Sequence, residues 1–449
     1  MNKILCIIAA SLLPVLAQAD AGTQNLLVIY RQALASDPVL ASAEKSNVAA
    51  QEKQVQGKAL LLPVLTMDAA AKHSDTDIHY REGVDQIGVR SAGDHGFETY
   101  QYGVNVTQPL FRKQNAIQYE QSKTQVTQAD MQLSLARQDL IVNVTQAYFD
   151  VVLAQDKINL LEAQKAAISQ QLEQAKANFE VGTATITDVN EAQARYDLTI
   201  AQEIAAQNDL ETKKRFVEFR TGQQPSRLAT AREDLRAVIP EPRDMEQWVA
   251  LAQQNNLPLK IQQQALQLAT QQIEYARAGH LPTLDVVGRY SDTGATGNVN
   301  GVGTDLRDAT VGLQFQIPLY QGGAITSRQR EAVANKDKAL DDVEAARREA
   351  DLRTRQSYLN VASAVAQVSA YEQALASSKS QLDSTNLGYE VGVRTSVDVL
   401  NAQQQYYQAK YNLLEVRYAW LVSIIKLKSY AGVLTEDDLA ETNRYLEGS

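Results

Sequence analysis

Apolar residues recur at alternating spacings of four and three, interrupted only by Lys165, along two very long stretches that contain neither glycine nor proline. In the first stretch they are Leu140, Val144, Ala147, Val151, Ala154, Ile158, Leu161, Ile168, Leu172, Ala175 and Phe179. In the second they are Ala402, Tyr406, Ala409, Leu413, Val416 and Trp420. Heptad spacing of this kind is typical of coiled-coil packing between long helices. The pattern predicts long helices over 112–181, 185–221, 324–390 and 395–431, and an ordinary coiled-coil rod is an open alternative.

Four other segments alternate apolar with polar residues, and most glycines gather around them. In one of them Tyr100, Tyr102, Val104 and Val106 alternate with polar or small residues. Alternation over about ten residues is typical of outer-membrane barrel strands, although a soluble hairpin domain would also show it. The predicted strands cover 62–75, 97–109, 281–292 and 308–319. A shorter helix is expected before the first strand of each repeat, over 257–279 in the second.

The chain repeats itself at a period of about 210 residues. Segment 179–196 aligns without a gap on 389–406, and half of these eighteen positions are identical. Self-similarity at a fixed period indicates two structural copies in one polypeptide. We place the first repeat at 20–230 and the second at 231–449, with equatorial segments at 222–256 and 432–449.

Four strands are too few to close a barrel by themselves. An open sheet edge in lipid would leave backbone groups unpaired at a cost of several kcal/mol each. Two copies would close only the smallest known kind of barrel, about eight strands filled by side chains, whereas three would give about twelve strands and a lumen. The expected fold is therefore mainly α with membrane β: a trimeric 12-stranded β-barrel, four strands per chain, continued by a 12-helix α-barrel.

The composition and the first residues indicate the cellular compartment and the kinds of chemistry to expect. Residues 1–19 have the charged start, apolar centre and small-residue cleavage site of a secretory signal peptide. The only cysteine, Cys6, lies inside it, so neither disulfide nor thiol chemistry is expected in the mature chain. A net charge of −10 disfavours a nucleic-acid partner. The four histidines have no ligand spacing, and no catalytic motif appears, so we expect no metal, cofactor or enzymatic activity.

Three motifs resemble those of a known family. They are segment 279–285 entering a predicted strand, segment 318–323 leaving one, and segment 388–402 at a helix-helix turn. Together they are similar to the TolC family of outer-membrane channel-tunnels, and the resemblance covers essentially the whole mature chain. It implies a homotrimer in outer-membrane lipid that projects into the periplasm of a Gram-negative cell. It also implies that 226–256 and the C-terminal tail form a belt around the helical tube.

The resemblance further implies a function in export without catalysis. Such a channel joins a periplasmic adaptor and an inner-membrane ABC or proton-driven transporter, and passes type I secreted proteins or small toxic molecules. A multidrug efflux factor alone is one alternative, although the absence of a lipid-modified cysteine favours type I secretion. A periplasmic coiled-coil scaffold or adaptor without a pore is an alternative of another class, but it gives no reason for four alternating strands.

Two Val-Gly turns are the expected tips of the helical hairpins. Gly182 and Gly392 each follow a very long predicted helix, where glycine favours a left-handed cap. The Thr-x-x-Asp pattern that follows each turn predicts a capping box at the start of the next helix. In one interpretation Asp188 and Asp398 only cap helices.

The resemblance assigns these tips a gate. Asp398 would contribute to a ring of three carboxylates at the closed periplasmic entrance, where mutual repulsion raises their pKa and cations collect. Asn401 occupies the next ring position, where relatives carry a second aspartate, and this places tight cation binding in doubt. A latch is also implied, in which Tyr389 and Arg394 of one turn hold Thr187 and Asp188 of another. A surface ion pair without a gating role is the alternative.

Overall fold

The computed structural model describes residues 23–79, 93–232, 234–298 and 302–447. The predicted signal peptide and Cys6 lie outside these residues. In order, the elements are α1 (Leu26–Ser36), α2 (Pro38–Ala59), β1 (Val64–Ile78), β2 (Gly93–Phe111), α3 (Lys113–Glu180), α4 (Ile186–Thr221), α5 (Met245–Asn255), α6 (Leu257–Ala278), β3 (Thr283–Ala295), β4 (Thr304–Gln316), α7 (Ala324–Glu390), α8 (Ser396–Tyr430) and α9 (Glu436–Asn443). The expected mainly helical chain with four strands is therefore confirmed.

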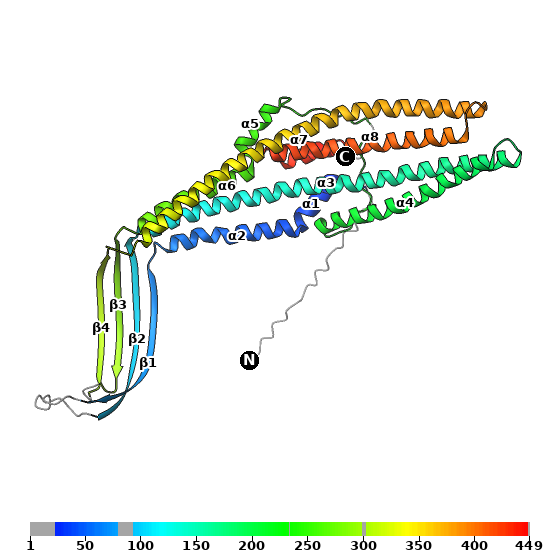
Figure 1. Cartoon of the computed structure of the whole chain (residues 1–449). Coiled ribbons are helices and arrows are strands. Elements are labelled where there is room, and N and C mark those ends of the chain that lie inside the picture. The colour runs from blue at the N-terminus through cyan, green and yellow to red at the C-terminus, as the bar shows by residue number, and fades with distance from the viewer. Residues whose placement is uncertain (1–22, 80–92, 233, 299–301, 448–449) are drawn as a thin grey trace, which may run out of the picture. The chain divides into compact units, whose positions relative to one another are not determined.

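The chain forms two compact units, each of which draws on both sequence repeats. Of the described residues, the first unit contains those within 23–38, 138–248 and 355–447, and the second contains those within 39–137 and 249–354. Both α3 and α7 run from the second unit into the first. In the first unit α4 lies beside the end of α3, and α8 lies beside the end of α7 (Figure 1).

The sheet belongs to the second unit and has the order β1-β2-β3-β4, with every neighbouring pair antiparallel (Figure 1). The pair β2-β3 joins the two sequence repeats, with Val104 opposite Tyr290. Strands β1 and β4 each have only one partner among the described strands. On β4, Val311, Leu313 and Phe315 are 84%, 70% and 64% exposed. Because alternate residues point to the same side of a strand, these three form one apolar, uncovered face.

An ion pair fixes the point where the sheet meets the helices. Arg112 immediately precedes α3 and donates two hydrogen bonds to Asp285 near the start of β3, at 2.8 and 2.6 Å. Asp285 is only 3% exposed. A bidentate arginine-carboxylate pair adds geometric precision to electrostatic attraction, so it defines how α3 leaves the sheet.

In the first unit, the described residues of the equatorial segments 222–256 and 432–449 pack against the long helices. Tyr148 on α3 donates from its hydroxyl to the carbonyl oxygen of Ala229 at 2.9 Å. Trp420 on α8 is fully buried and donates its indole N–H to the carbonyl oxygen of Val238 at 3.1 Å. The isolated bridge between Ala231 and Leu446 ties this segment to the C-terminal tail. Both equatorial segments are thus held on the helices of their own chain.

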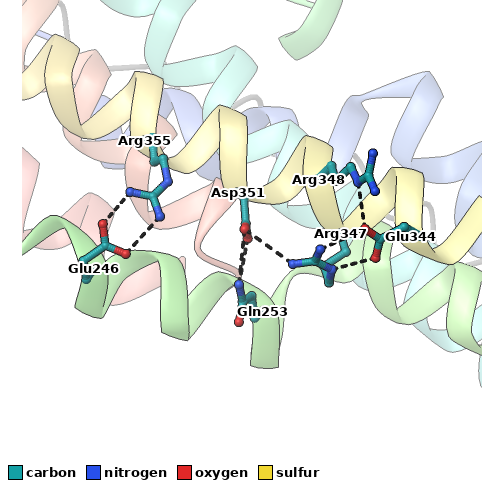
Figure 2. A network of polar contacts seen from close by, with 7 residues as sticks. All are labelled: Glu246, Gln253, Glu344, Arg347, Arg348, Asp351 and Arg355. Carbon is teal, nitrogen blue, oxygen red and sulfur yellow. Dashed lines mark hydrogen bonds and ion pairs between the residues drawn. The ribbon is translucent and has the colours of Figure 1, made fainter.

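Charged side chains connect α5 with α7, as Figure 2 shows. Within the first unit, Arg355 donates two hydrogen bonds to the carboxylate of Glu246. Within the second, Gln253 donates to Asp351 at 3.0 Å, and Asp351 also pairs with Arg347. These contacts are exposed to solvent, so each adds little to stability and mainly orients α5 on α7.

Among the described residues, no helix combines the length and the apolar character that crossing a membrane requires.

Candidate functional site: the tips of the helical hairpins

The two hairpin turns have the same backbone geometry in both repeats. Gly182 has φ of 80° and Gly392 has φ of 79°, which is the left-handed region that glycine adopts without strain. In the first turn the N–H of Thr183 donates to the carbonyl oxygen of Asn178 at 2.8 Å, and Val393 donates to Gly388 at 2.9 Å in the second. These bonds satisfy the last carbonyl groups of α3 and α7, so both helices end here.

A capping box begins the helix after each turn. The side chain of Asp188 accepts from the backbone N–H of Thr185 at 2.9 Å, and Asp398 accepts from that of Thr395 at 2.9 Å. In return each threonine hydroxyl accepts from the backbone N–H of the aspartate, at 3.3 and 3.2 Å. The predicted boxes are therefore present, and both aspartates cap their own helices.

The capping contacts also affect the charge of Asp398. The backbone and hydroxyl groups of Thr395 donate to its carboxylate and lower its pKa, with a smaller contribution from the nearby Arg394. Within one chain the pKa thus moves opposite to the increase expected from three repelling carboxylates. Asp398 is consequently ionised at neutral pH and can still attract cations.

Within the described part of the chain, no side-chain hydrogen bond or ion pair joins the four predicted latch residues to one another. The hydroxyl of Tyr389 accepts from the side-chain amide of Asn178 at 3.2 Å, which links α7 to α3. The backbone N–H of Arg394 donates to the carbonyl oxygen of Gly388 at 3.1 Å, whereas its guanidinium has no hydrogen-bond partner among the described residues. A Cβ atom at Gly388 would lie 2.7 Å from the Cγ of Arg394. Thr187 is exposed on the first turn of α4. A latch of the predicted kind would therefore have to form between chains.

Behind the tips, α3, α4 and α8 pack together. Four buried side chains form this cluster: Ile168, Leu172, Ala192 and Leu400. Ala192 is completely buried, and its small side chain allows α4 and α8 to approach closely. Beside the cluster, the buried amide of Gln171 donates to the hydroxyl of Ser396 at 3.0 Å. The start of α8 is thus held in a defined position against α3 and α4.

Arg195 on α4 is a contact residue that sequence reasoning missed. Its guanidinium donates to Gln404 at 2.5 Å and to Asn401 at 3.1 Å, both on α8. A third donor reaches Glu191 at 3.1 Å. The repeat alignment contains a signal that could have identified this residue. Arg195 aligns with Gln405 of the second copy, so the two copies differ in charge at this position.

Comparison with known proteins agrees with this geometry. The family model described as "Outer membrane efflux protein" matches residues 29–222 and 248–433. The chain belongs to this family. It is 34% identical to the outer membrane protein TolC of Vibrio cholerae, over 97% of this chain and 98% of that protein.

Two further comparisons define the family relationship. The proteases secretion protein PrtF of Dickeya chrysanthemi is 29% identical over 97% of this chain and 94% of its own length. The solved structure of CusC has a TM-score of 0.78 at 17% identity, covering 91% of this chain and 92% of that one, and shows the shared fold.

Membership of the outer membrane efflux protein family places the chain in the outer membrane as an export channel. This is a family of transport channels rather than enzymes. The alternative of a pore-less periplasmic scaffold is not favoured, since both the family match and the four-stranded sheet argue against it.

Proposed function

We propose that three copies of the chain form one continuous conduit, with a β-barrel of twelve strands followed by a tube of twelve helices. The observation that carries this proposal is the sheet, whose edge strands β1 and β4 each have one free edge among the described residues. Pairing β4 of one copy with β1 of the next satisfies both edges. A closed barrel leaves no unpaired backbone in lipid.

The side chains of the sheet support a membrane-facing surface. Val311, Leu313 and Phe315 are among the most exposed apolar residues on the sheet, whereas Gln314 and Gln316 alternate with them on the other side. In a barrel with a wet interior, apolar residues face lipid and polar residues face the lumen. This alternation therefore suits β4 to the wall of a membrane channel.

The helices also have surfaces that a single chain does not cover. Phe216 and Phe219 on α4 are 65% and 60% exposed, and Leu352 and Leu359 on α7 are nearly as exposed. Exposed apolar residues in such number are typical of interaction surfaces. Neighbouring copies in a ring of helices would cover them.

The tips supply the gate of the proposed conduit. Three copies of Asp398 near the axis form an anionic ring at the periplasmic entrance, with Asn401 as a neutral second level. Arg394 of one copy pairs with Asp188 and Thr187 of the next, assisted by Tyr389, and the unpaired guanidinium of the single chain is available for this contact. Exposed ion pairs are individually weak, so docking of a periplasmic adaptor can break three of them.

The cargo is proposed to be a type I secreted protein or small toxic molecules, delivered by an inner-membrane transporter through the adaptor. PrtF is named for protease secretion, which supports the first of these. Multidrug efflux alone is the second candidate, supported by the family description and by the fold shared with CusC.

Cysteine cross-linking tests the trimeric barrel directly. The only cysteine, Cys6, is removed if the signal peptide is cleaved after residue 19 as expected, so introduced cysteines have no native competitor. Met67→Cys on β1 is combined in turn with Val311→Cys, Leu313→Cys or Phe315→Cys on β4. Oxidation in membranes is expected to give dimers and trimers for at least one pair, with the trimer as the largest product.

The matched control is Val104→Cys with Tyr290→Cys, which face each other within one chain and should give only an internal disulfide. Monomers alone from every β1-β4 pair, or a ladder extending beyond three chains, would contradict the proposed closure.

A further inference from the structure

Arg195 bridges the two helical hairpins of one chain with all of its nitrogen donors engaged. It lies on α4, its side chain is 29% exposed, and its Nη1 and Nη2 atoms donate to Gln404 and Asn401 of α8. The Nε atom donates to Glu191 one turn earlier on α4, which holds the guanidinium plane in place. A planar fork fixed from one side can reach two side-chain carbonyl oxygens on a neighbouring helix at once.

We propose that Arg195 is a specificity-determining residue of the channel entrance, with two separable effects. Its geometry ties α8 to α4 in the closed arrangement. Its charge occupies the level of Asn401, one helical turn beyond Asp398, and so limits the cation affinity of the entrance. This inference rests on the proposed conduit. It gives Arg195, which belongs to neither the latch nor the ring, a role in the closed tip.

The apolar residues beside Arg195 show why its hydrogen bonds matter for the position of α8. Leu400 and Ala192 are buried between the same two helices, so the apolar contact already holds α8 near α4. Apolar packing is not directional, whereas the two hydrogen bonds of Arg195 require one axial position of α8. Displacement of α8 along or away from α4 breaks both bonds together, so Arg195 favours the closed state.

The charge effect follows from the neutral partners. Asn401 and Gln404 accept hydrogen bonds without contributing negative charge, and Glu191 is the one carboxylate that contacts the guanidinium among the described residues. An aspartate placed at 401 would lie within hydrogen-bonding distance of Arg195 and be neutralised by it. The entrance therefore gains little cation affinity from Asn401→Asp as long as Arg195 is present.

The test is divalent-cation block of single channels formed by the full chain in planar bilayers. Wild type, Arg195→Gln, Asn401→Asp and the double variant are titrated with Ca²⁺, and the half-blocking concentration and open conductance are measured. Asn401→Asp alone should change the half-blocking concentration less than about twofold, whereas the double variant should lower it roughly tenfold, a coupling normal for groups in contact.

Two further variants separate the tie from the charge. Arg195→Lys keeps a positive charge but cannot bridge two acceptors, so it should raise conductance as Arg195→Gln does while leaving Ca²⁺ block near wild type. Arg215→Gln removes an exposed cation from the same helix, where it pairs with Glu218, and should change neither readout.

The inference is overturned if Asn401→Asp alone blocks as strongly as the double variant, or if Arg195→Gln leaves conductance unchanged. Different outcomes contradict the proposed conduit itself. They are a wild type that forms no channels, or channels whose Ca²⁺ block is not weakened by Asp398→Asn, whichever residue is present at position 195.

Discussion

Replacing Tyr418 by phenylalanine removes one hydrogen bond from a partly buried carboxylate in the first unit. The Tyr418 hydroxyl donates to Asp156 on α3 at 2.5 Å, and its ring stacks on Phe149 at 5.6 Å between centroids. Burial raises the pKa of Asp156, whereas the hydrogen bond from Tyr418 lowers it. The substitution keeps the ring and its packing, so its effect isolates the hydroxyl.

The expected cost follows from this environment. Hydrogen bonds to charged groups contribute about 1.5–3 kcal/mol, and a partly buried acceptor that loses its donor keeps most of its desolvation penalty. Because no cavity larger than an oxygen atom is created, we expect a loss of about 2 kcal/mol, which corresponds to a roughly 30-fold shift in an opening equilibrium. The same hydroxyl accepts from the backbone N–H of Ala231 at 3.4 Å, so the equatorial segment should loosen with it.

Native-state hydrogen exchange, read by mass spectrometry on peptides covering 226–238, measures this opening locally. Tyr371→Phe on α7 is the matched control, because the Tyr371 hydroxyl has no hydrogen-bond partner among the described residues. Asp156→Asn in the Tyr418→Phe background should recover part of the loss by removing the unpaired charge. Exchange within about twofold of the Tyr371→Phe control would refute the reasoning, since that factor is far below the expected shift.

Three further predictions concern pH, the turns and the gate. The pKa of Asp156 lies above its ordinary value of 3.8, so the contribution of this group to stability is fully present below that pH and is lost as pH rises through the raised pKa. In chemical denaturation, the free energy of unfolding of Asp156→Asn should therefore increase relative to that of wild type as pH rises from 3.8 to the raised pKa. Above the raised pKa the difference between the two should stay constant. Gly182→Ala and Gly392→Ala should each cost about 1–2 kcal/mol by forcing a left-handed alanine, and unchanged thermal unfolding would contradict this. Arg394→Ser should increase single-channel conductance by breaking the latch, while Asp398→Asn, which keeps a capping oxygen, should reduce the preference for cations; equal conductance and selectivity in both variants would speak against the gate.

Much of the fold could be predicted from local patterns. The long helices follow from heptad spacing without glycine or proline, and the strands from alternation, because both signals depend only on neighbouring residues. β4 is an example, since the apolar positions 311, 313 and 315 identify both the strand and its apolar face. The capping boxes were also predictable, because Thr185 and Asp188 lie within one helical turn of each other.

The contacts between distant segments could not be predicted in this way. Arg195 meets Asn401 and Gln404 across about two hundred residues, and no local pattern specifies the axial position of α8 against α4. Asn178 was missed for the same reason, although its repeat counterpart is Gly388 and the two copies thus diverge where they make contact. The two compact units likewise cut across the repeats, because packing follows position along the helices rather than sequence order.

Single-channel recording of the purified wild-type protein in planar bilayers tests the central claim most directly. A trimeric conduit closed at its tips by Asp398 and the latch predicts discrete, small conductance steps that prefer cations and are blocked by Ca²⁺ from the side of the tips. Protein that inserts as a trimer but gives no discrete steps, or large steps without cation preference, would contradict the account.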